Sequence, residues 1–321
     1  MAGSKAMSAA ELQERLDRYL ALRRALGFAM LAEERLLRDF LRFRQSQTPD
    51  TVIRAQTALE WACSTAARCG PGGQARRLSV ARGFLRHLQA SVPQTEIPSA
   101  HLIGGAVRRT PYLYSEAQIQ ALMEHAQNLQ SCGGLRPHTI ATLIGLLVSC
   151  GLRASEALRL RLTDVDLGSA TPHLQVLQTK FRKSRLVPMD PSTAAALQDY
   201  AKQRHRLGYD NLCDRFFVSE RGTPQSYEAS ADSFRILVRR TGIREGTARP
   251  TLHCLRHTFA VRRLIAWYHA GEDVQARIPE LSVYLGHVRP QETYWYLSAT
   301  PRLLDLAALR FEALVGPGNA S

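Results

Sequence analysis

The sequence predicts a mainly α-helical protein with a small antiparallel β-sheet, divided into two domains. Its 321 residues exceed the roughly 100 to 200 residues of a typical domain. Apolar residues recur at helical spacing along most of the chain, whereas strand-like alternation is confined to residues 173–189. A stretch with prolines, a glycine pair and no periodicity separates the two groups of helical segments. We therefore expect a helical domain at 1–95, a linker at 96–111 and a mixed α and β domain at 112–321.

Four amphipathic segments make up the expected N-terminal domain. The first begins at Ser8, because a serine followed three residues later by a glutamate, Glu11, is a capping box. Apolar residues at helical spacing predict three further helices, at 32–44, roughly 52–68 and 78–90. Arginines fall on the polar faces of these segments, so the domain presents positive charge to solvent.

The second domain combines helices with one hairpin. Ser115 is placed to cap a helix that ends near residue 128, and the apolar run TIATLIGLLVSC is too long for a strand and predicts a buried helix. In HLQVLQTKFRKSRLVPM, alternation, a polar centre and a second apolar pair predict a β-hairpin with a basic tip. Helical spacing returns in four later segments, 192–206, 228–241, 253–269 and 300–314.

A strong excess of positive charge points to a polyanionic partner. The chain has 42 Lys and Arg against 28 Asp and Glu, a formal net charge of +14, and both its N-terminal third and the remainder are basic. Nucleic acid is the expected partner, and a basic surface that serves only solubility is the alternative. There is neither an apolar run of membrane-spanning length nor a signal-peptide pattern. We expect a cytoplasmic, nucleoid-associated protein without a membrane partner.

The segment TLHCLRHTFAVRRL brings three polar side chains to one side of an expected helix. His253 and Arg256 are three residues apart, and His257 follows His253 by four, so all three can converge on one ligand. The spacing of the histidines also fits a metal site, but no glutamate equivalent to that of an HExxH motif lies between them and the six cysteines lack zinc-finger spacing. A metal site, a packing role and a phosphate-holding cluster are the three interpretations.

Two further motifs carry candidate site residues. Arg153, in GLRASEAL, directly follows the buried helix and can be aimed into a pocket, or it is a helix-end arginine stabilised by Glu156. Only four lysines occur in the chain, and two of them, Lys180 and Lys183, fall together at the expected hairpin tip. A lysine can donate a proton, whereas a guanidinium stays protonated. A lysine at this place therefore indicates a general acid.

The order and spacing of these motifs resemble the tyrosine recombinase (phage integrase) family. The resemblance rests on GLRASEAL, TKFRKSRLVP, HCLRH, LGH and a tyrosine nine residues beyond that last histidine. It covers about residues 112–300 and, more loosely, the N-terminal helices. It implies a DNA core-binding domain at 1–95 and a catalytic domain at 112–321 with a C-terminal tail helix. The implied catalytic residues are Arg153, Lys180, His253, Arg256, His287 and Tyr296.

By this resemblance the protein is a site-specific recombinase that cuts and rejoins DNA through a covalent 3′-phosphotyrosine intermediate. Arg153 and Arg256 suit phosphate oxygens because guanidinium forks bind them bidentately. Tyr296 is the implied nucleophile with His253 as its base, His287 is a hydrogen-bond donor, and Lys180 is the acid for the leaving 5′-oxygen. The covalent link stores the energy of the broken bond, so no metal, nucleotide or other cofactor is expected.

Two departures from the family pattern and two rival functions stay open at this stage. The segment between the HCLRH and LGH motifs is long, and Tyr294 is a second candidate nucleophile. The rivals are a type IB topoisomerase-like enzyme and a DNA-binding regulator on an inactivated recombinase scaffold. The expected partners are double-stranded DNA and further copies of the chain, as a tetramer on paired DNA sites, with accessory DNA-bending proteins as an optional addition.

Overall fold

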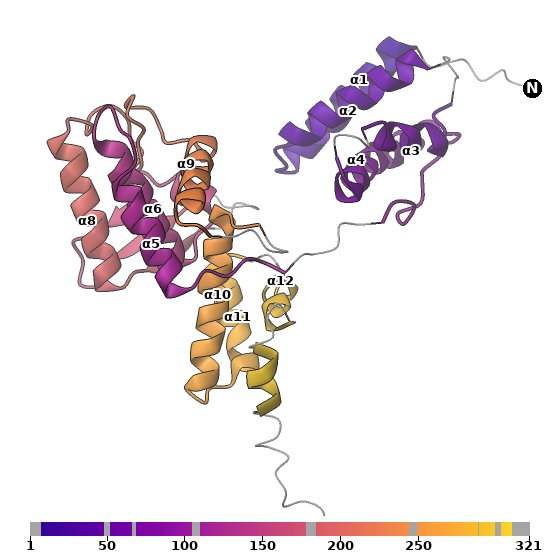
Figure 1. Ribbon diagram of the computed structural model, residues 1–321. Helices are drawn as coiled ribbons and strands as arrows, with labels where there is room; N and C mark the ends of the chain where they lie inside the picture. Colours follow the sequence, from indigo (N-terminus) through magenta and orange to yellow (C-terminus); the bar gives the residue numbers. More distant parts are fainter. Residues whose placement is uncertain are drawn as a thin grey trace, which may run out of the picture. The chain divides into compact units, whose positions relative to one another are not determined.

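The structure, a computed structural model, is mainly α-helical with one small antiparallel sheet, which confirms the expected fold class (Figure 1). It divides into two compact units, Met1–Arg108 and Arg109–Ser321. None of the helices in the described part of the chain is long and apolar enough to cross a membrane. The described residues are 8–47, 52–65, 69–104, 110–177, 184–243, 249–287, 289–298 and 303–309.

The described part of the first unit contains four helices around one core. They are α1 (Ala9–Ala25), α2 (Leu31–Ser46), α3 (Ala55–Cys63) and α4 (Pro71–Gln89). The capping box of Ser8 and Glu11 is present at the start of α1. The helix α4 begins seven residues before the predicted position, because Pro71 favours the first turn although the apolar pattern starts only at Leu78. Trp61, Phe40 and Phe84 are fully buried at the centre of the unit.

The second unit contains the remaining elements, packed largely on α6 (Figure 1). All the leucines and isoleucines of α6 are buried, as expected for the continuous apolar run from which it is built. The elements are α5 (Glu116–Gln127), α6 (Leu135–Cys150), α7 (Ala154–Ala157), η1 (Leu162–Asp164), β1 (Val165–Asp166), β2 (His173–Val176), β3 (Arg185–Pro188), α8 (Pro191–Arg206), α9 (Tyr227–Arg240), α10 (Leu252–His269), α11 (Val274–Leu285), α12 (Gln291–Tyr294) and η2 (Trp295–Ser298).

The sheet contains the predicted hairpin. Strands β2 and β3 pair in antiparallel fashion with Leu174 opposite Val187 and Val176 opposite Arg185, and β1 adds a short third strand beside β2. Leu174, Val176 and Val187 are buried, so the alternation in the sequence marks the face that packs on the core. The tip of the hairpin, residues 178–183, lies outside the described residues, and both Lys180 and Lys183 belong to it.

The long segment between HCLRH and LGH forms the end of α10 and a helix, α11, that sequence patterning did not predict. A proline inside a helix normally disrupts it, and α11 contains Pro279. The side chain of Asp273 caps the helix, and Val274, Ile278 and Leu285 are buried against α10. Tertiary packing of one apolar stripe therefore stabilises a helix that local propensity opposes.

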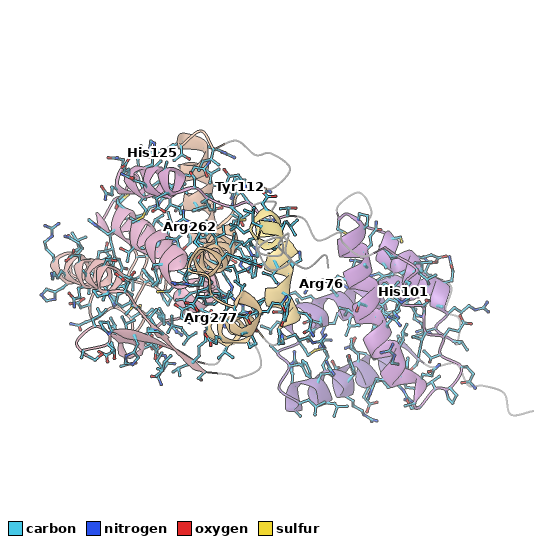
Figure 2. All side chains as sticks on the ribbon, turned by 90° about the horizontal axis from the view of Figure 1, so that it is seen from below. Arg76, His101, Tyr112, His125, Arg262 and Arg277 are labelled. Carbon is cyan, nitrogen blue, oxygen red and sulfur yellow. The ribbon has the colours of Figure 1, made fainter. Side chains whose placement is uncertain are left out.

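Arginine side chains lie on both units (Figure 2), and most of the basic residues in the sequence are arginines. Arg76 projects from α4 in the first unit, whereas Arg262 on α10 and Arg277 on α11 belong to the second. Some of these side chains pair with carboxylates, as Arg262 does with Glu116 at 2.8 Å. Exposed pairs of this kind contribute at most about 1 kcal/mol each to stability, so they leave the surface available to a stronger anion.

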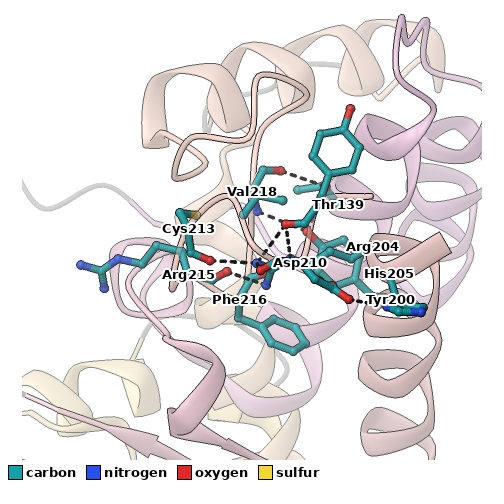
Figure 3. A network of polar contacts seen from close by, with 10 residues as sticks. Thr139, Tyr200, Arg204, His205, Asp210, Cys213, Arg215, Phe216 and Val218 are labelled. Atoms are coloured by element: carbon teal, nitrogen blue, oxygen red, sulfur yellow. Dashed lines mark hydrogen bonds and ion pairs between the residues drawn. The ribbon is translucent and has the colours of Figure 1, made fainter. Parts of the chain in front are cut away.

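Arg204, in α8, is buried and organises the loop that follows its helix (Figure 3). Its guanidinium donates hydrogen bonds to backbone carbonyls at 2.7 to 3.3 Å. These acceptors belong to Tyr209, Asp210, Cys213, Arg215 and Phe216. A buried carbonyl without a partner costs about 1 to 3 kcal/mol, and one side chain supplies donors to five carbonyls of this loop.

We expect Arg204→Met to lower the free energy of unfolding by at least about 3 kcal/mol, because several buried carbonyls lose their donor at once. Urea unfolding followed by circular dichroism measures this loss. Arg206→Met is the matched control, since Arg206 lies on the same helix but is exposed. Equal unfolding midpoints for the two variants would show that the loop does not depend on Arg204.

Candidate active site

Three arginines converge on the C-terminal end of α11. Arg185 Nε donates to the carbonyl of residue 284 at 2.8 Å, Arg256 Nη2 to that of residue 285 at 2.7 Å, and Arg153 Nη2 to that of residue 286 at 3.1 Å. The last carbonyls of a helix lack intrahelical donors and carry the negative end of its dipole, so they attract cations. Three consecutive carbonyls thereby hold three arginines next to His287. One arginine belongs to β3, one belongs to α10 and one lies directly before α7.

The position of Arg153 follows from the way α6 ends. Gly151 closes the helix with a φ of 61°, and a Cβ atom at this residue would lie 2.3 Å from the ring of Phe259. Only glycine fits both constraints. The Gly151 carbonyl accepts a hydrogen bond from Arg256 Nη1 at 2.9 Å, so the turn that presents Arg153 also holds the second arginine.

A buried carboxylate, Glu156, connects the arginines. It accepts hydrogen bonds from Arg153 Nη1 at 2.7 Å and from Arg185 Nη2 at 2.8 Å, and Arg256 Nη1 lies 4.0 Å away. Only 8% of the Glu156 side chain is exposed. Burial alone would raise the pKa of this carboxyl group, but the bonds from Arg185 and Arg153 lower it to about 2. Glu156 is therefore ionised at neutral pH and offsets part of the positive charge of the cluster.

The lowered pKa of Glu156 predicts a loss of stability in acid. Its value in the folded protein, about 2, lies below the ordinary 4.5, so the unfolded chain binds more protons as the pH falls. The contribution is fully present above pH 4.5 and is lost as the pH falls toward 2. Glu156→Gln should lower the free energy of unfolding at pH 7, on the order of 3 kcal/mol, and flatten its dependence on pH between 4.5 and 2.

Urea unfolding of the two proteins at several pH values measures this effect. Glu228→Gln serves as the control, because it removes an exposed carboxylate of α9 and leaves the arginines untouched. If Glu156→Gln kept the acid dependence of the wild-type protein, the carboxylate would have no special place in its stability.

The helix α10 supplies His253 and Arg256 from one face, as their spacing predicted. Desolvation, followed by repulsion from Arg153, lowers the pKa of Arg256 to about 10, so this buried guanidinium stays charged at neutral pH. Desolvation and the charges of Arg256 and Arg153 lower the pKa of His253 to about 4. A neutral imidazole can accept a proton, as a base requires.

Tyr296, in η2, lies buried among aromatic and histidine rings, with 2% of its surface exposed. Its hydroxyl shares a hydrogen bond with Nδ1 of His257 at 2.9 Å, and its ring stacks on that of His287 with centroids 6.3 Å apart. The His287 Nδ1 atom lies 2.7 Å from the Thr293 hydroxyl, which orients the imidazole. Tyr294, by contrast, is 44% exposed. Of the two tyrosines, Tyr296 is the one whose hydroxyl contacts the histidine cluster.

Five of the six candidate residues therefore lie in one contiguous network, and the sixth, Lys180, lies outside the described residues. One member of the network, Arg185, was not singled out from the sequence, and His257 was expected as a possible ligand but not as a catalytic residue. From the sequence, Glu156 was expected only as a residue that stabilises Arg153 at the end of a helix, and the ion pair between the two is present. The signal for Arg185 was weak, because an arginine at a strand end is usually exposed.

The network favours a phosphate over a metal among the interpretations of the histidine and arginine cluster. Within the described residues no three His, Cys, Asp or Glu side chains gather as metal ligands would. Arg256 uses two of the five N–H donors that a guanidinium carries for the carbonyls that hold it. The remaining N–H donors of Arg153 and Arg256 can bind the oxygens of a phosphodiester that lies beside the Tyr296 hydroxyl. Such a site can stabilise the charge that develops when an oxygen nucleophile attacks phosphorus.

Comparison with known protein families and sequences gives a consistent result. The phage integrase family model matches residues 113–302. The chain is 39% identical to a putative integrase/recombinase, y4rB, of Sinorhizobium fredii, over 94% of this chain and 96% of that protein. It is 28% identical to the tyrosine recombinase XerC of Chlamydia trachomatis, over 71% of this chain and 67% of that protein.

Solved structures share the fold at lower sequence identity. The XerH site-specific recombinase, in a post-cleavage complex with a palindromic difH substrate, matches 95% of this chain and 85% of its own, with a TM-score of 0.67 and 16% identity. The integrase of the Tn1549 transposon, in complex with transposon right end DNA, matches 95% of this chain and 99% of its own, with a TM-score of 0.67 and 18% identity.

Proposed function

The chain belongs to the phage integrase family of tyrosine recombinases, enzymes that break and rejoin DNA, and we propose that six of its residues carry out this reaction. They are Arg153, Lys180, His253, Arg256, His287 and Tyr296. The observation that carries the proposal is the convergence of Arg153 and Arg256 on the carbonyls that precede His287, whose ring stacks on Tyr296.

The proposed reaction begins when the Tyr296 oxygen attacks the scissile phosphorus. His253, neutral at pH 7, takes the phenolic proton, and the bond between phosphorus and the 5′-oxygen breaks. Arg153, Arg256 and His287 bind the nonbridging oxygens, and Lys180 protonates the leaving 5′-oxygen. The product is a 3′-phosphotyrosine. Attack on it by the 5′-hydroxyl of a partner strand reverses each proton transfer and completes strand exchange.

Double-stranded DNA is the partner, and both units of the chain are proposed to bind it. Residues 1–95 would form a core-binding domain and residues 112–321 the catalytic domain, joined by a linker at 96–111. The basic surfaces of both units support this arrangement. Each phosphate that a protein neutralises contributes about 0.9 to the slope of log affinity against log salt.

Deleting residues 1–95 should therefore lower both the DNA affinity and the magnitude of this slope by several times 0.9. Fluorescence anisotropy with a labelled duplex, over a series of salt concentrations, measures the slope. The catalytic unit should keep its circular dichroism spectrum, which controls for folding. An unchanged slope would mean that the N-terminal unit does not touch the phosphate backbone.

Assembly on DNA as a homotetramer on paired sites is proposed as well. Leu303 of the helical segment 303–309 packs into the core that contains Tyr296, whereas Leu304 and Leu309 are exposed apolar residues of the same segment. An apolar surface directly after the nucleophile suits contact with a second copy. Mass photometry on DNA with one site and with two sites tests the stoichiometry.

The experiment that tests the proposed function uses duplexes from the DNA that flanks the gene, chosen for inverted repeats. Wild-type protein, without metal or nucleotide, should convert two such duplexes into recombinant strands. A topoisomerase-like enzyme would relax a supercoiled plasmid but produce no recombinants. A regulator would bind the duplex and form no covalent adduct. Either of these results would contradict the proposal.

A further inference from the structure

Arg185 is a largely buried arginine whose guanidinium touches two other elements, α7 and α11. It begins β3, and 11% of its side chain is exposed. Its Nη2 and Nη1 atoms donate to the two carboxylate oxygens of Glu156 at 2.8 and 3.3 Å, and its Nε atom donates to the Tyr284 carbonyl at 2.8 Å. The side chain thereby ties the hairpin to α7 on one side and to the end of α11 on the other.

The carboxylate that Arg185 holds is the same one that holds Arg153. The backbone N–H of Arg153 donates to Glu156 Oε2 at 3.0 Å, and its Nη1 atom donates to Oε1 at 2.7 Å. Each carboxylate oxygen therefore accepts bonds from both arginines. If Arg185 were lost, the carboxylate could rotate, and the direction of the Arg153 guanidinium would change with it.

Arg185 also lies against the turn that carries His287. Gly286 has a φ of 67°, and a Cβ atom there would lie 2.7 Å from Arg185 Nη1 and 3.0 Å from its Cζ. Because several hydrogen bonds fix the guanidinium, it cannot move aside to admit this atom. The carbonyl of Gly286 is the acceptor for Arg153 Nη2. Arg185 thus packs on the backbone that orients both Arg153 and His287.

We infer that Arg185 is a positioning residue for DNA cleavage, which acts through Glu156 and the turn at Gly286 to aim Arg153 at the scissile phosphate. The inference rests on the proposed function. Arg185 itself need not touch DNA, since its donors serve Glu156 and Tyr284. Small displacements of a catalytic group, near 1 Å, can cost about a hundredfold in rate.

Four proteins test the inference: the wild type, Arg185→Lys, Arg153→Lys and the double variant. Lysine keeps the charge but is a single point donor, so it cannot serve both Glu156 oxygens and the Tyr284 carbonyl in one plane. We expect Arg185→Lys to slow covalent adduct formation about ten- to a hundredfold in single turnover, with the dissociation constant for DNA within about twofold of wild type. Arg235→Lys, on the exposed face of α9, is the control and should cleave at the wild-type rate.

The double variant separates a positioning role from a merely structural one. If Arg185 acts through Arg153, the double variant should cleave no more than about twofold slower than Arg153→Lys alone, because the group being aimed is already impaired. A loss equal to the product of the two single losses would overturn the inference, as would a wild-type rate in Arg185→Lys. Urea unfolding of each variant verifies that it is folded under the assay conditions.

Should Arg185→Lys fail to fold, Arg185→Gln, which keeps a donor to Glu156, is examined in the same cycle with the same outcomes. The wild-type protein distinguishes failure of the inference from failure of the proposed function. A wild-type protein that forms no adduct contradicts the proposed function. A wild-type protein that forms the adduct, beside an Arg185 variant that forms it equally fast, contradicts the inference alone.

Discussion

Tyr296→Phe is expected to abolish the covalent adduct with DNA and to leave DNA binding nearly unchanged. The substitution removes a single oxygen, the proposed nucleophile, and keeps the ring that stacks on His287. It also removes the hydrogen bond to His257, which should cost about 1 kcal/mol of stability. A duplex with a nick close to the cleavage site loses the short fragment that carries the 5′-hydroxyl, which traps the cleaved strand on the protein. Denaturing gel electrophoresis then measures the adduct.

Tyr294→Phe is the matched control for this experiment. Tyr294 lies two residues away and is 44% exposed, so its loss should change neither the fold nor the adduct. An adduct that persists in Tyr296→Phe and disappears in Tyr294→Phe would move the nucleophile to Tyr294. An adduct in both variants would exclude both tyrosines of this segment.

The hydrogen bond between His257 and Tyr296 engages the hydroxyl of the proposed nucleophile. A tyrosine hydroxyl has an ordinary pKa near 10, and a phenolate needs nearby cations to form at neutral pH. In the described structure the hydroxyl faces the His257 imidazole and is almost excluded from solvent. If His253 takes the phenolic proton, as proposed, the hydroxyl must exchange its bond with His257 for one with His253.

Local features of the fold could be predicted from the sequence because they depend on neighbouring residues. Ser8 forms the capping box that its spacing indicated, and Ser115 caps its helix as expected. The alternation around Leu174 identified β2. The helix α11 could not be predicted in this way, since Pro279 argues against a helix, and its packing on α10 and α12 stabilises one.

The same distinction between neighbouring residues and long-range contacts holds for the site. His253 and Arg256 share a helix face, so their convergence follows from spacing alone. The bond between Glu156 and Arg185 joins residues 29 apart, and the bond between His257 and Tyr296 joins residues 39 apart. No local pattern encodes such contacts. The family resemblance supplied the order of the motifs, but not the three carbonyls at the end of α11 that hold the arginines.

The second large effect is expected from Lys180, the proposed general acid. A sugar alkoxide is a poor leaving group at neutral pH, and general acid catalysis typically contributes about a hundred- to ten-thousandfold in rate. Lys180→Ala should therefore slow cleavage of ordinary DNA by a factor in this range. Lys183→Ala is the matched control, because it removes the other lysine of the same hairpin tip.

The chemical identity of the leaving group decides whether Lys180 is the acid. A strand whose 5′-bridging oxygen is replaced by sulfur leaves as a thiolate, which hardly needs a proton. Lys180→Ala should cleave this strand at close to the wild-type rate. Arg153→Ala should stay slow on both strands, because the charge on the phosphoryl oxygens must be stabilised whichever atom leaves. Sulfur rescue of Lys183→Ala in place of Lys180→Ala would reverse the assignment. Rescue of neither would make His287 the next candidate, since its imidazole lies beside Tyr296.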